Sequence, residues 1–253
     1  MAKRGGLGQR LFVHGADIST GVQDFSDTGA GWTPLTSTDI TQLAVSREIG
    51  GQRDGRLGMN NFFDPAAGAA HEVLSALPTT DVILTWVTDV SVLGAPTFSL
   101  VGKQVDYAPT RAQDGSFLFA TSAMGNGYGG EWGETLTLGK RTDAGATSGS
   151  GVDFDASTDF GLTAYLHVVS FTGTDATVKL QESSDNGVGD AWADVVGGGF
   201  AQILGGAPKA LRIQTARDLT VERYLRAVTV TTGGFSDLQF VVSATKPDHE
   251  VLF

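Results

Sequence analysis

Short runs of alternating apolar and polar residues, separated by glycine-rich turns, extend along most of the chain. This period of two is the pattern of half-buried β-strands. Residues 41–48 and 56–62 both show it, and the glycines of residues 50–55 between them predict a β-hairpin over residues 41–62. The apolar face of this hairpin would carry Leu43, Val45, Leu57 and Met59. Its opposite, polar face would carry Gln42, Ser46, Glu48, Arg56 and Asn60.

One helix interrupts this β pattern. Apolar residues between positions 65 and 77 recur with the spacing of one face of an amphipathic helix. Asp64 is a good N-cap and Pro65 suits the first helical position, while Pro78 ends the segment. We therefore expect a helix over residues 65–77. Its apolar stripe begins with small alanines, so it should lie close against a sheet.

Further strands are predicted on both sides of a polar stretch. In the first part of the chain they fall within residues 9–18, 81–88, 97–107, 116–122 and 134–138, and residues 19–38 form a long loop. In the second part they fall within residues 162–171, 176–181, 191–196, 211–214, 222–231 and 238–244. Between the two parts, residues 143–151 are small and polar without periodicity, which is typical of a flexible linker. The fold class is therefore mainly β, with an N-terminal domain over residues 1–142 and a C-terminal, jelly-roll-like β-sandwich over residues 152–253.

Charge and composition exclude several classes of protein. The 253 residues include 17 basic and 28 acidic side chains, and the resulting net charge of −11 opposes tight binding to nucleic acid. There is no cysteine, which excludes disulfides, a thiolate nucleophile and cysteine-bound zinc. No apolar stretch is long enough to span a membrane, and none resembles a signal peptide. We expect a protein that is made and assembled in a cytoplasm.

No motif points to catalysis or to a cofactor. Residues 125–130 fit the pattern GxGxxG, but strand-like sequence follows them where a phosphate-binding turn would open a helix. The acidic stretches 153–159 and 185–190 lack the bidentate glutamate of a calcium loop, so we expect solvated turns. The histidines are scattered, and no Gly-x-Ser-x-Gly motif is present. We predict neither an enzyme nor a metal or cofactor site. The sequence leaves open that two carboxylates meet in space, as they do in a glycosidase.

Several aromatic residues would suit the apolar faces of sugars. Trp192 follows a polar loop, and Trp192 and Tyr165 are the candidate surface residues for reading a ligand on the C-terminal domain. The alternative is a packed position in a strand, to which we give the greater weight for Trp192. Trp86 lies in an apolar run and is expected in the core.

Five short phrases of the sequence together resemble a known family. They are Phe62-Phe-Asp-Pro-Ala66, Ala76-Leu-Pro-Thr-Thr-Asp81, Gly125-Asn-Gly-Tyr-Gly129, Trp132-Gly-Glu-Thr-Leu136 and Val178-Lys-Leu-Gln-Glu-Ser-Ser-Asp-Asn186. Over most of its length the chain resembles the major tail proteins, or tail tube proteins, of long flexible-tailed bacteriophages (siphophages), especially those of actinobacteria. The resemblance rests on these phrases and on the order of the elements, without an invariant chemical signature.

This resemblance implies a structural virion protein, with copies that form hexameric rings and rings that stack into the tail tube. The N-terminal domain would be a tail-tube-like β-sandwich or half-barrel, with its helix outside the barrel. Its hairpins would be residues 41–62 and the pair 97–107 and 116–122. The residues facing the lumen would be Gln42, Ser46, Glu48, Arg56 and Asn60. DNA would pass through the lumen without tight binding, and the partners would be the tape measure, tail terminator and baseplate proteins.

Self-association is also favoured on physical grounds, because two-faced hairpins leave unpaired strand edges that a closed ring would satisfy. The sequence leaves open whether the C-terminal domain decorates the exterior or belongs to the tube wall. It also leaves open whether residues 1–8 and 245–253 are tails or arms between subunits. The alternative functions are a carbohydrate-binding, lectin-like β-sandwich and another virion role, such as capsid decoration or tail termination.

Overall fold

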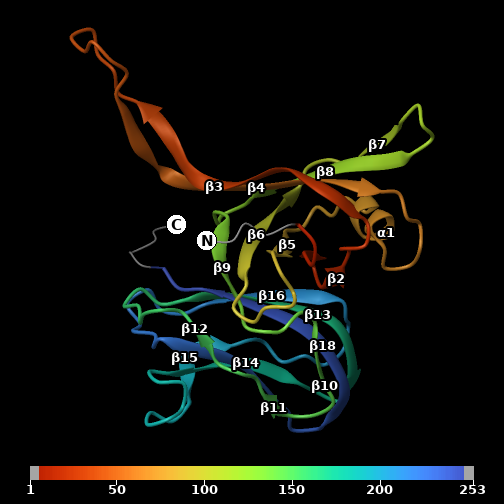
Figure 1. Cartoon of the computed structure of the whole chain (residues 1–253), viewed down its shortest axis with the longest axis vertical. Helices are drawn as coiled ribbons and strands as arrows, with labels where there is room; N and C mark the ends of the chain where they lie inside the picture. The colour runs from red at the N-terminus through yellow and green to blue at the C-terminus, as the bar shows by residue number, and fades with distance from the viewer. Residues whose placement is uncertain (1–5, 248–253) are drawn as a thin grey trace.

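The computed structural model describes residues 6–247, apart from the burial of residues 50 and 51. The predicted terminal tails or arms, residues 1–8 and 245–253, therefore lie mostly outside the described residues. The first elements are β1 (Arg10–Val13), β2 (Ala16–Asp17), β3 (Val22–Thr36), β4 (Arg47–Phe62), α1 (Ala70–Ser75), β5 (Val82–Val87), β6 (Pro96–Gln104), β7 (Ala108–Arg111), β8 (Phe117–Gly125) and β9 (Glu131–Thr135). They are followed by β10 (Arg141–Asp143), β11 (Thr147–Ser148), β12 (Val152–Asp153), β13 (Thr163–Gly173), β14 (Thr177–Ser183), β15 (Ala193–Gly199), β16 (Lys209–Gln214), β17 (Tyr224–Val230) and β18 (Phe235–Thr245). The fold is mainly β, as the sequence predicts, and Figure 1 shows its two bodies of strands.

The N-terminal body encloses one apolar core. Side chains of β1, β5 and β6 pack there against side chains of β4, β8 and α1. Leu57 and Met59 of β4 are buried in this core, as their alternation in the sequence predicts, and Leu74 of α1 packs with them. The helix therefore covers the core-facing side of the sheet that contains β4 and β8.

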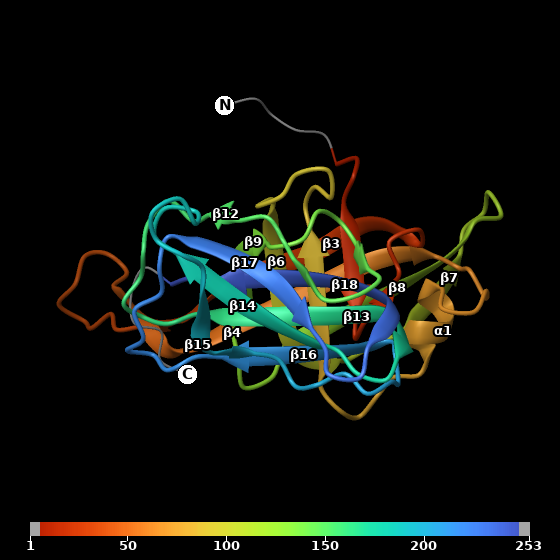
Figure 2. The same ribbon diagram turned by 90° about the horizontal axis from the view of Figure 1, so that it is seen from below.

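The C-terminal body is a sandwich of two sheets, which Figure 2 shows from below. Strands β16, β13, β18 and β10 are neighbours in one sheet, and β15, β14 and β17 with β11 and β12 form the other. The inner faces share a core cluster that includes Leu166, Val178, Leu180, Leu225, Phe240 and Val242. The predicted C-terminal β-sandwich is confirmed.

A continuous sheet joins the two bodies. β9 pairs with β6 on one side and with β18 on the other, so hydrogen bonds run from the first body into the second. Phe12, Val87 and Val241 form a small apolar cluster between the bodies. Both contacts tie the N-terminal strands to the C-terminal sandwich.

His167 lies fully buried at this junction. The backbone N–H of Gly15 donates to its Nδ1 at 3.2 Å, and its Nε2 lies 2.9 Å from Oγ1 of Thr85. Because Nδ1 accepts, the neutral ring carries its proton on Nε2 and donates it to Thr85. Burial lowers the pKa of His167 to about 3.

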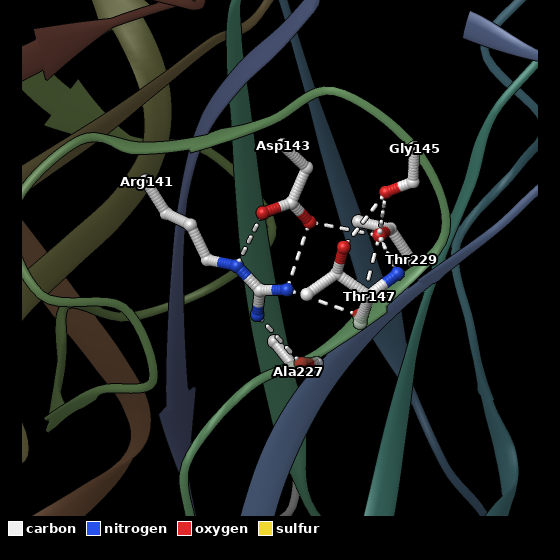
Figure 3. Close-up of polar contacts among 6 residues, drawn as sticks. All are labelled: Arg141, Asp143, Gly145, Thr147, Ala227 and Thr229. Atoms are coloured by element: carbon white, nitrogen blue, oxygen red, sulfur yellow. Dashed lines mark hydrogen bonds and ion pairs between the residues drawn. The ribbon is translucent and has the colours of Figure 1, made fainter.

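The segment predicted as a flexible linker forms short strands of both sheets instead. β10 pairs with β18, and β11 and β12 pair with β17. Nε and Nη2 of Arg141 donate to the two oxygens of Asp143 at 2.8 Å, and Nη1 of Arg141 donates to the carbonyl of Ala227 at 2.9 Å (Figure 3). Polar side chains hold this segment, which is why it shows no apolar period. The division of the chain into domains here stays a prediction.

The helix is shorter than predicted for residues 65–77. Gly68 has a φ of 74°, which a right-handed helix does not contain, so the helix begins only after it. Asp64, the expected N-cap, instead accepts from the backbone N–H of Ala66 at 2.9 Å in a turn. At the other end Leu77 has a φ of 43° and stops the helix.

Candidate functional site

An extended hairpin projects from the N-terminal body (Figure 1). It is formed by β3 and β4, of 15 and 16 residues, which pair from Val22 with Asn61 to Thr36 with Arg47. Residues 30–36 of β3 are exposed throughout. The outer half of the hairpin therefore has no core of its own within the described residues.

This hairpin differs from the predicted one. Residues 19–38, expected to form a loop, supply β3, and the reversal lies at residues 37–46 instead of 50–55. The glycine-rich residues 50–55 lie inside β4, where they allow another segment to approach. A Cβ at Gly55 would lie 2.3 Å from the backbone N of Gly130, so only glycine fits.

The reversal presents aliphatic side chains to solvent. Ile40 and Leu43 are fully exposed, with relative exposures of 103% and 107%, and Val45 is also exposed. The predicted core-facing positions of Leu43 and Val45 are therefore wrong, because no described residue covers the tip. An exposed apolar tip on an extended hairpin is typical of a contact with another molecule.

Two of the predicted lumen-facing residues, Gln42 and Ser46, belong to this reversal. The backbone N–H of Asp39 donates to Oε1 of Gln42 at 3.3 Å, and the backbone N–H of Ser46 donates to Oγ1 of Thr38 at 2.9 Å. These two residues close the end of the hairpin, and they do not lie on a strand face as predicted.

The other three, Glu48, Arg56 and Asn60, lie on β4. Nε of Arg56 is 2.5 Å from Oδ2 of Asp27, and Nδ2 of Asn60 donates to Oδ1 of Asp24 at 2.7 Å. The residues that alternate with Arg56 and Asn60 are buried, so these two face away from the core. Glu48 is exposed nearer the tip. The outward face of the hairpin is polar, and its arginine is paired with a carboxylate.

The strands β3 and β7 are edges of a sheet in the order β3, β4, β8, β7. Within residues 6–247, β3 pairs only with β4 and β7 only with β8. The second hairpin is thus formed by β7 and β8 and not by residues 97–107 with 116–122, because β6 pairs with β8 only over residues 102–104. Edge strands leave a row of backbone groups that can pair with another chain.

A cleft of about 430 Å³ separates the root of the hairpin from the C-terminal sandwich. Its lining includes Trp32, Arg53, Trp132, Phe160, Arg217 and Lys246. Nη2 of Arg53 donates to the carbonyl of Gly130 at 3.2 Å, which ties β4 to the start of β9. No pattern in the sequence indicates this cleft, because segments far apart in the chain build it.

A buried carboxyl group lies at the inner wall of this cleft. The hydroxyl of Tyr165 donates to Oε2 of Glu131, and the guanidinium of Arg212 lies 3.9 Å from the ring centroid of Tyr128. Nε of Arg212 donates to the hydroxyl oxygen of Tyr165 at 3.4 Å. Burial raises the pKa of Glu131, while Tyr165 and Arg212 act in the opposite direction. The cluster links β9, β13 and β16 inside the protein.

Neither Tyr165 nor Trp192, the two candidate surface residues for binding a ligand, presents a free aromatic face. Tyr165 is fully buried, because both faces of β13 are covered at this position, so its prediction as a surface residue is wrong. Trp192 is half-buried, and the guanidinium of Arg226 lies 4.4 Å from its ring centroid. A Cβ at Gly151 or Gly187 would lie within 2.9 Å of the indole. Trp192 is therefore packed, as the alternative interpretation expects.

The acidic turns bind their own backbone and neighbouring side chains. The carboxylate of Asp185 accepts from three backbone N–H groups of residues 188–190, and these bonds lower its pKa. Nε and Nη2 of Arg223 each lie 2.6 Å from an oxygen of Asp153. In the part of the chain that the structure describes, no cluster of three or more His, Asp or Glu side chains is arranged to hold a metal ion. No described helix is long and apolar enough to cross a membrane.

Comparisons with known proteins give weak similarities. No family model matches the sequence. No curated protein matches it either. The Dit protein (gp 19.1) of SPP1, described as a paradigm of the hub adsorption apparatus in phages that infect Gram-positive bacteria, is 12% identical, with 94% of this chain and 98% of that chain covered and a TM-score of 0.31. A chain from the tail of an empty GTA particle with C6 symmetry is 12% identical, with 51% of this chain and 97% of that chain covered and a TM-score of 0.36. At these TM-scores neither similarity establishes a shared fold or function.

Proposed function

We propose that this chain is a structural subunit of a bacteriophage tail, and that six copies form a ring that stacks with others into the tail tube. The resemblance in the sequence suggests this function. The observation that carries the proposal is the extended β3–β4 hairpin, which combines an unpaired edge strand with an exposed apolar tip.

The two edges of the hairpin sheet support closure between copies. An edge of β3 in one copy can pair with the edge of β7 in the next, and repetition of this contact around an axis forms a barrel without open edges. Such a contact joins two different surfaces of neighbouring copies. It closes into a ring only when the rotation from one copy to the next is a whole-number fraction of a full turn. The tip, with Ile40 and Leu43, then contacts copies in an adjacent ring.

The polar outward face supports a lumen. Arg56 is paired with Asp27, so its charge is already partly neutralised and is less available to hold a phosphate backbone. Together with the net charge of −11 this favours passage of DNA over its retention. The C-terminal sandwich lies on the opposite side of the N-terminal core (Figure 1), so in this arrangement it faces the exterior of the tube.

Electron microscopy of the purified full-length protein tests the proposal. We expect six-fold rings or tubes in negative stain, with their fraction rising with protein concentration. A monodisperse compact particle at every concentration would contradict the proposal. Such a particle that also binds in a glycan array would instead favour the lectin-like alternative.

Binding of DNA gives a second test of the same function. In an electrophoretic shift assay at physiological salt we expect no length-dependent binding of duplex DNA at nanomolar concentrations, because Arg56 is paired with Asp27 and the chain has a net charge of −11. Nanomolar binding that weakens steeply with salt would contradict a role as a passive conduit.

A further inference from the structure

Two hollows meet at Trp132, at the root of the hairpin. The cleft of about 430 Å³ described above and a second hollow of about 330 Å³ share Trp132, Lys246 and Pro247 in their linings. Each volume lies within the range of about 300–1,000 Å³ that is typical of sites for small molecules. We call the two hollows together the groove. Because it continues past one aromatic side chain, it suits an elongated ligand of several units better than a single small ring.

Three aromatic side chains present surface to the cleft. Trp32 and Phe160 are each 37% exposed and Trp132 is 51% exposed. Trp132 is held by packing, with its ring centroid 5.9 Å from that of Trp86 and 5.2 Å from that of Phe98. Its exposed part is therefore positioned before a ligand arrives, which reduces the cost of binding. Rigid aromatic faces of this kind suit the apolar faces of sugar rings.

The charge of the cleft is opposite to that of the whole protein. Arg53, Arg217 and Lys246 line it, whereas the chain has a net charge of −11. Arg217 is exposed, and within residues 6–247 no group forms a hydrogen bond or ion pair with its side chain. Burial lowers the pKa of Lys246 to about 8, so it is still mainly protonated at neutral pH, and burial raises the pKa of the acid in this cleft, Glu131. The cleft therefore favours a ligand with an anionic group.

Polar side chains complete the walls of the groove. Gln214 and Thr245 line the cleft, and Ser157 and Glu134 line the second hollow. Burial raises the pKa of Glu134 to about 7, so at neutral pH about half of this carboxyl group carries a proton that it can donate. Amide, hydroxyl and protonated carboxyl groups can each form hydrogen bonds with the hydroxyl groups of a sugar. A few such groups beside aromatic surface fix the orientation of a ligand.

The strand that carries Trp132 offers no free edge to a peptide. β9 pairs with β6 on one side and with β18 on the other. An extended peptide binds to a sheet by adding a strand to an unpaired edge, so β9 favours a ligand that side chains recognise. Nucleic acid, which would also stack on aromatic side chains, is disfavoured by the net charge of −11. A saccharide with an acidic group is the ligand that fits both the walls and the charge.

We propose that the groove binds an anionic oligosaccharide, with an acidic group of the ligand at Arg217 and a sugar ring against Trp132. The acidic group is a carboxylate or a phosphate, both of which match the paired donors of a guanidinium group. Further units of the oligosaccharide extend past Trp132 into the second hollow. One chain supplies every residue of the groove, so this inference holds whether or not copies assemble into a tube.

Isothermal titration of the full-length protein with two acidic oligosaccharides tests the proposal. Hexagalacturonic acid carries carboxylates, and phosphorylated pentamannose carries a phosphate. We expect at least one of them to bind at neutral pH, and the one that binds identifies the acidic group. Its uncharged counterpart, the methyl ester or the dephosphorylated pentamannose, should bind about tenfold more weakly, because it lacks the anionic group. No binding of either acid up to millimolar concentration, or equal binding of an acid and its counterpart, would overturn the proposal.

The variant Arg217→Gln tests where the anionic group lies. We expect the acid to bind about tenfold more weakly to this variant, while the affinity for the uncharged counterpart stays unchanged. Arg217 is exposed, so urea unfolding should give wild-type stability. Arg111→Gln, at an exposed position on β7, is the matched control and should keep the wild-type affinity for the acid. No weakening in Arg217→Gln, or equal weakening in both variants, would overturn the assignment of the anionic group to the cleft.

Fluorine NMR of the full-length protein labelled with 5-fluorotryptophan locates the bound ligand. Replacement of each tryptophan by phenylalanine assigns the resonances. We expect the acid that binds to shift the resonances of Trp32 and Trp132. Trp192 does not line the groove and packs beside Arg226, so its resonance is the internal control and should not shift. A shift of Trp192 without a shift of Trp132 would place the ligand elsewhere and overturn the proposal.

Dilution of the protein without ligand tests a second copy as the occupant of the groove. We expect the resonances of Trp32 and Trp132 to be independent of protein concentration. A shift on dilution that the acidic oligosaccharide does not suppress would show that a second molecule fills the groove, and the proposal would be overturned.

Discussion

The guanidinium of Arg141 binds the carboxylate of Asp143 through two parallel hydrogen bonds, each 2.8 Å long. The side chains are only 14% and 4% exposed, and Oγ1 of Thr229 donates to the same carboxylate at 2.8 Å. Two residues of one short strand thus connect β10 to β17 across the edge of the C-terminal sandwich (Figure 3). Removal of one partner from a buried pair with this geometry destabilises the protein strongly, because the other charge stays buried without compensation.

We therefore expect Arg141→Met to lower the free energy of unfolding by about 3–5 kcal/mol, because it leaves the carboxylate of Asp143 buried without its cation. The measurement is urea unfolding followed by circular dichroism. The matched control is Arg223→Met, which breaks the exposed pair with Asp153 and should have a much smaller effect. Equal losses in the two variants would show that burial does not strengthen the Arg141 pair.

Folding is linked to pH through His167. Its pKa is about 3 in the folded protein and near 6.5 when unfolded, so both states hold the ring neutral above pH 6.5 and its contribution is fully present there. As the pH falls below 6.5 the unfolded chain takes up the proton first. The free energy of unfolding then falls by up to about 1.4 kcal/mol per pH unit, until the folded state protonates near pH 3.

The variant His167→Gln should reduce this slope between pH 6.5 and pH 4, because glutamine does not titrate. Urea unfolding at several pH values measures the slope for the variant and the wild type. An unchanged slope in His167→Gln would show that other groups cause the acid sensitivity.

The contact between Tyr165 and Glu131 predicts a coupling energy. Tyr165→Phe removes the hydroxyl that donates to a buried carboxyl group, and we expect a loss of about 1–3 kcal/mol in the free energy of unfolding. Glu131→Gln keeps an acceptor for the hydroxyl, so the loss should be smaller. A double-mutant cycle measures the interaction, and strict additivity of the two variants would show that the residues do not stabilise each other.

The strands of both cores were predictable because burial on one face produces alternation. Leu57 and Met59 show this directly. The same rule failed for β3, where both faces are exposed beyond residue 30 and no alternation exists. The glycines of residues 50–55 indicated a reversal, but they serve the close approach of β9, which depends on tertiary structure.

The burial of Tyr165 has a signal in the sequence. Residues 163–168 are all buried, because both faces of β13 are covered. Their sequence is a nearly continuous apolar run. Such a run indicates a strand without an exposed face. The cleft had no comparable signal, because Trp32, Trp132 and Phe160 approach each other only in the folded chain.

The exposed tip of the hairpin gives the sharpest prediction for assembly. We expect Leu43→Asp to prevent tube formation, because it places a charge where the proposed function requires an apolar contact with a neighbouring ring. The position is fully exposed in the single chain, so the free energy of unfolding should change by no more than about 0.5 kcal/mol. Sedimentation velocity measures assembly, and urea unfolding measures stability.

Leu204→Asp, which changes an exposed leucine of the C-terminal half, is the matched control and should assemble like the wild type. Assembly of Leu43→Asp at the wild-type concentration would show that the tip does not join copies, whereas loss of assembly in both variants would indicate a general effect of added charge.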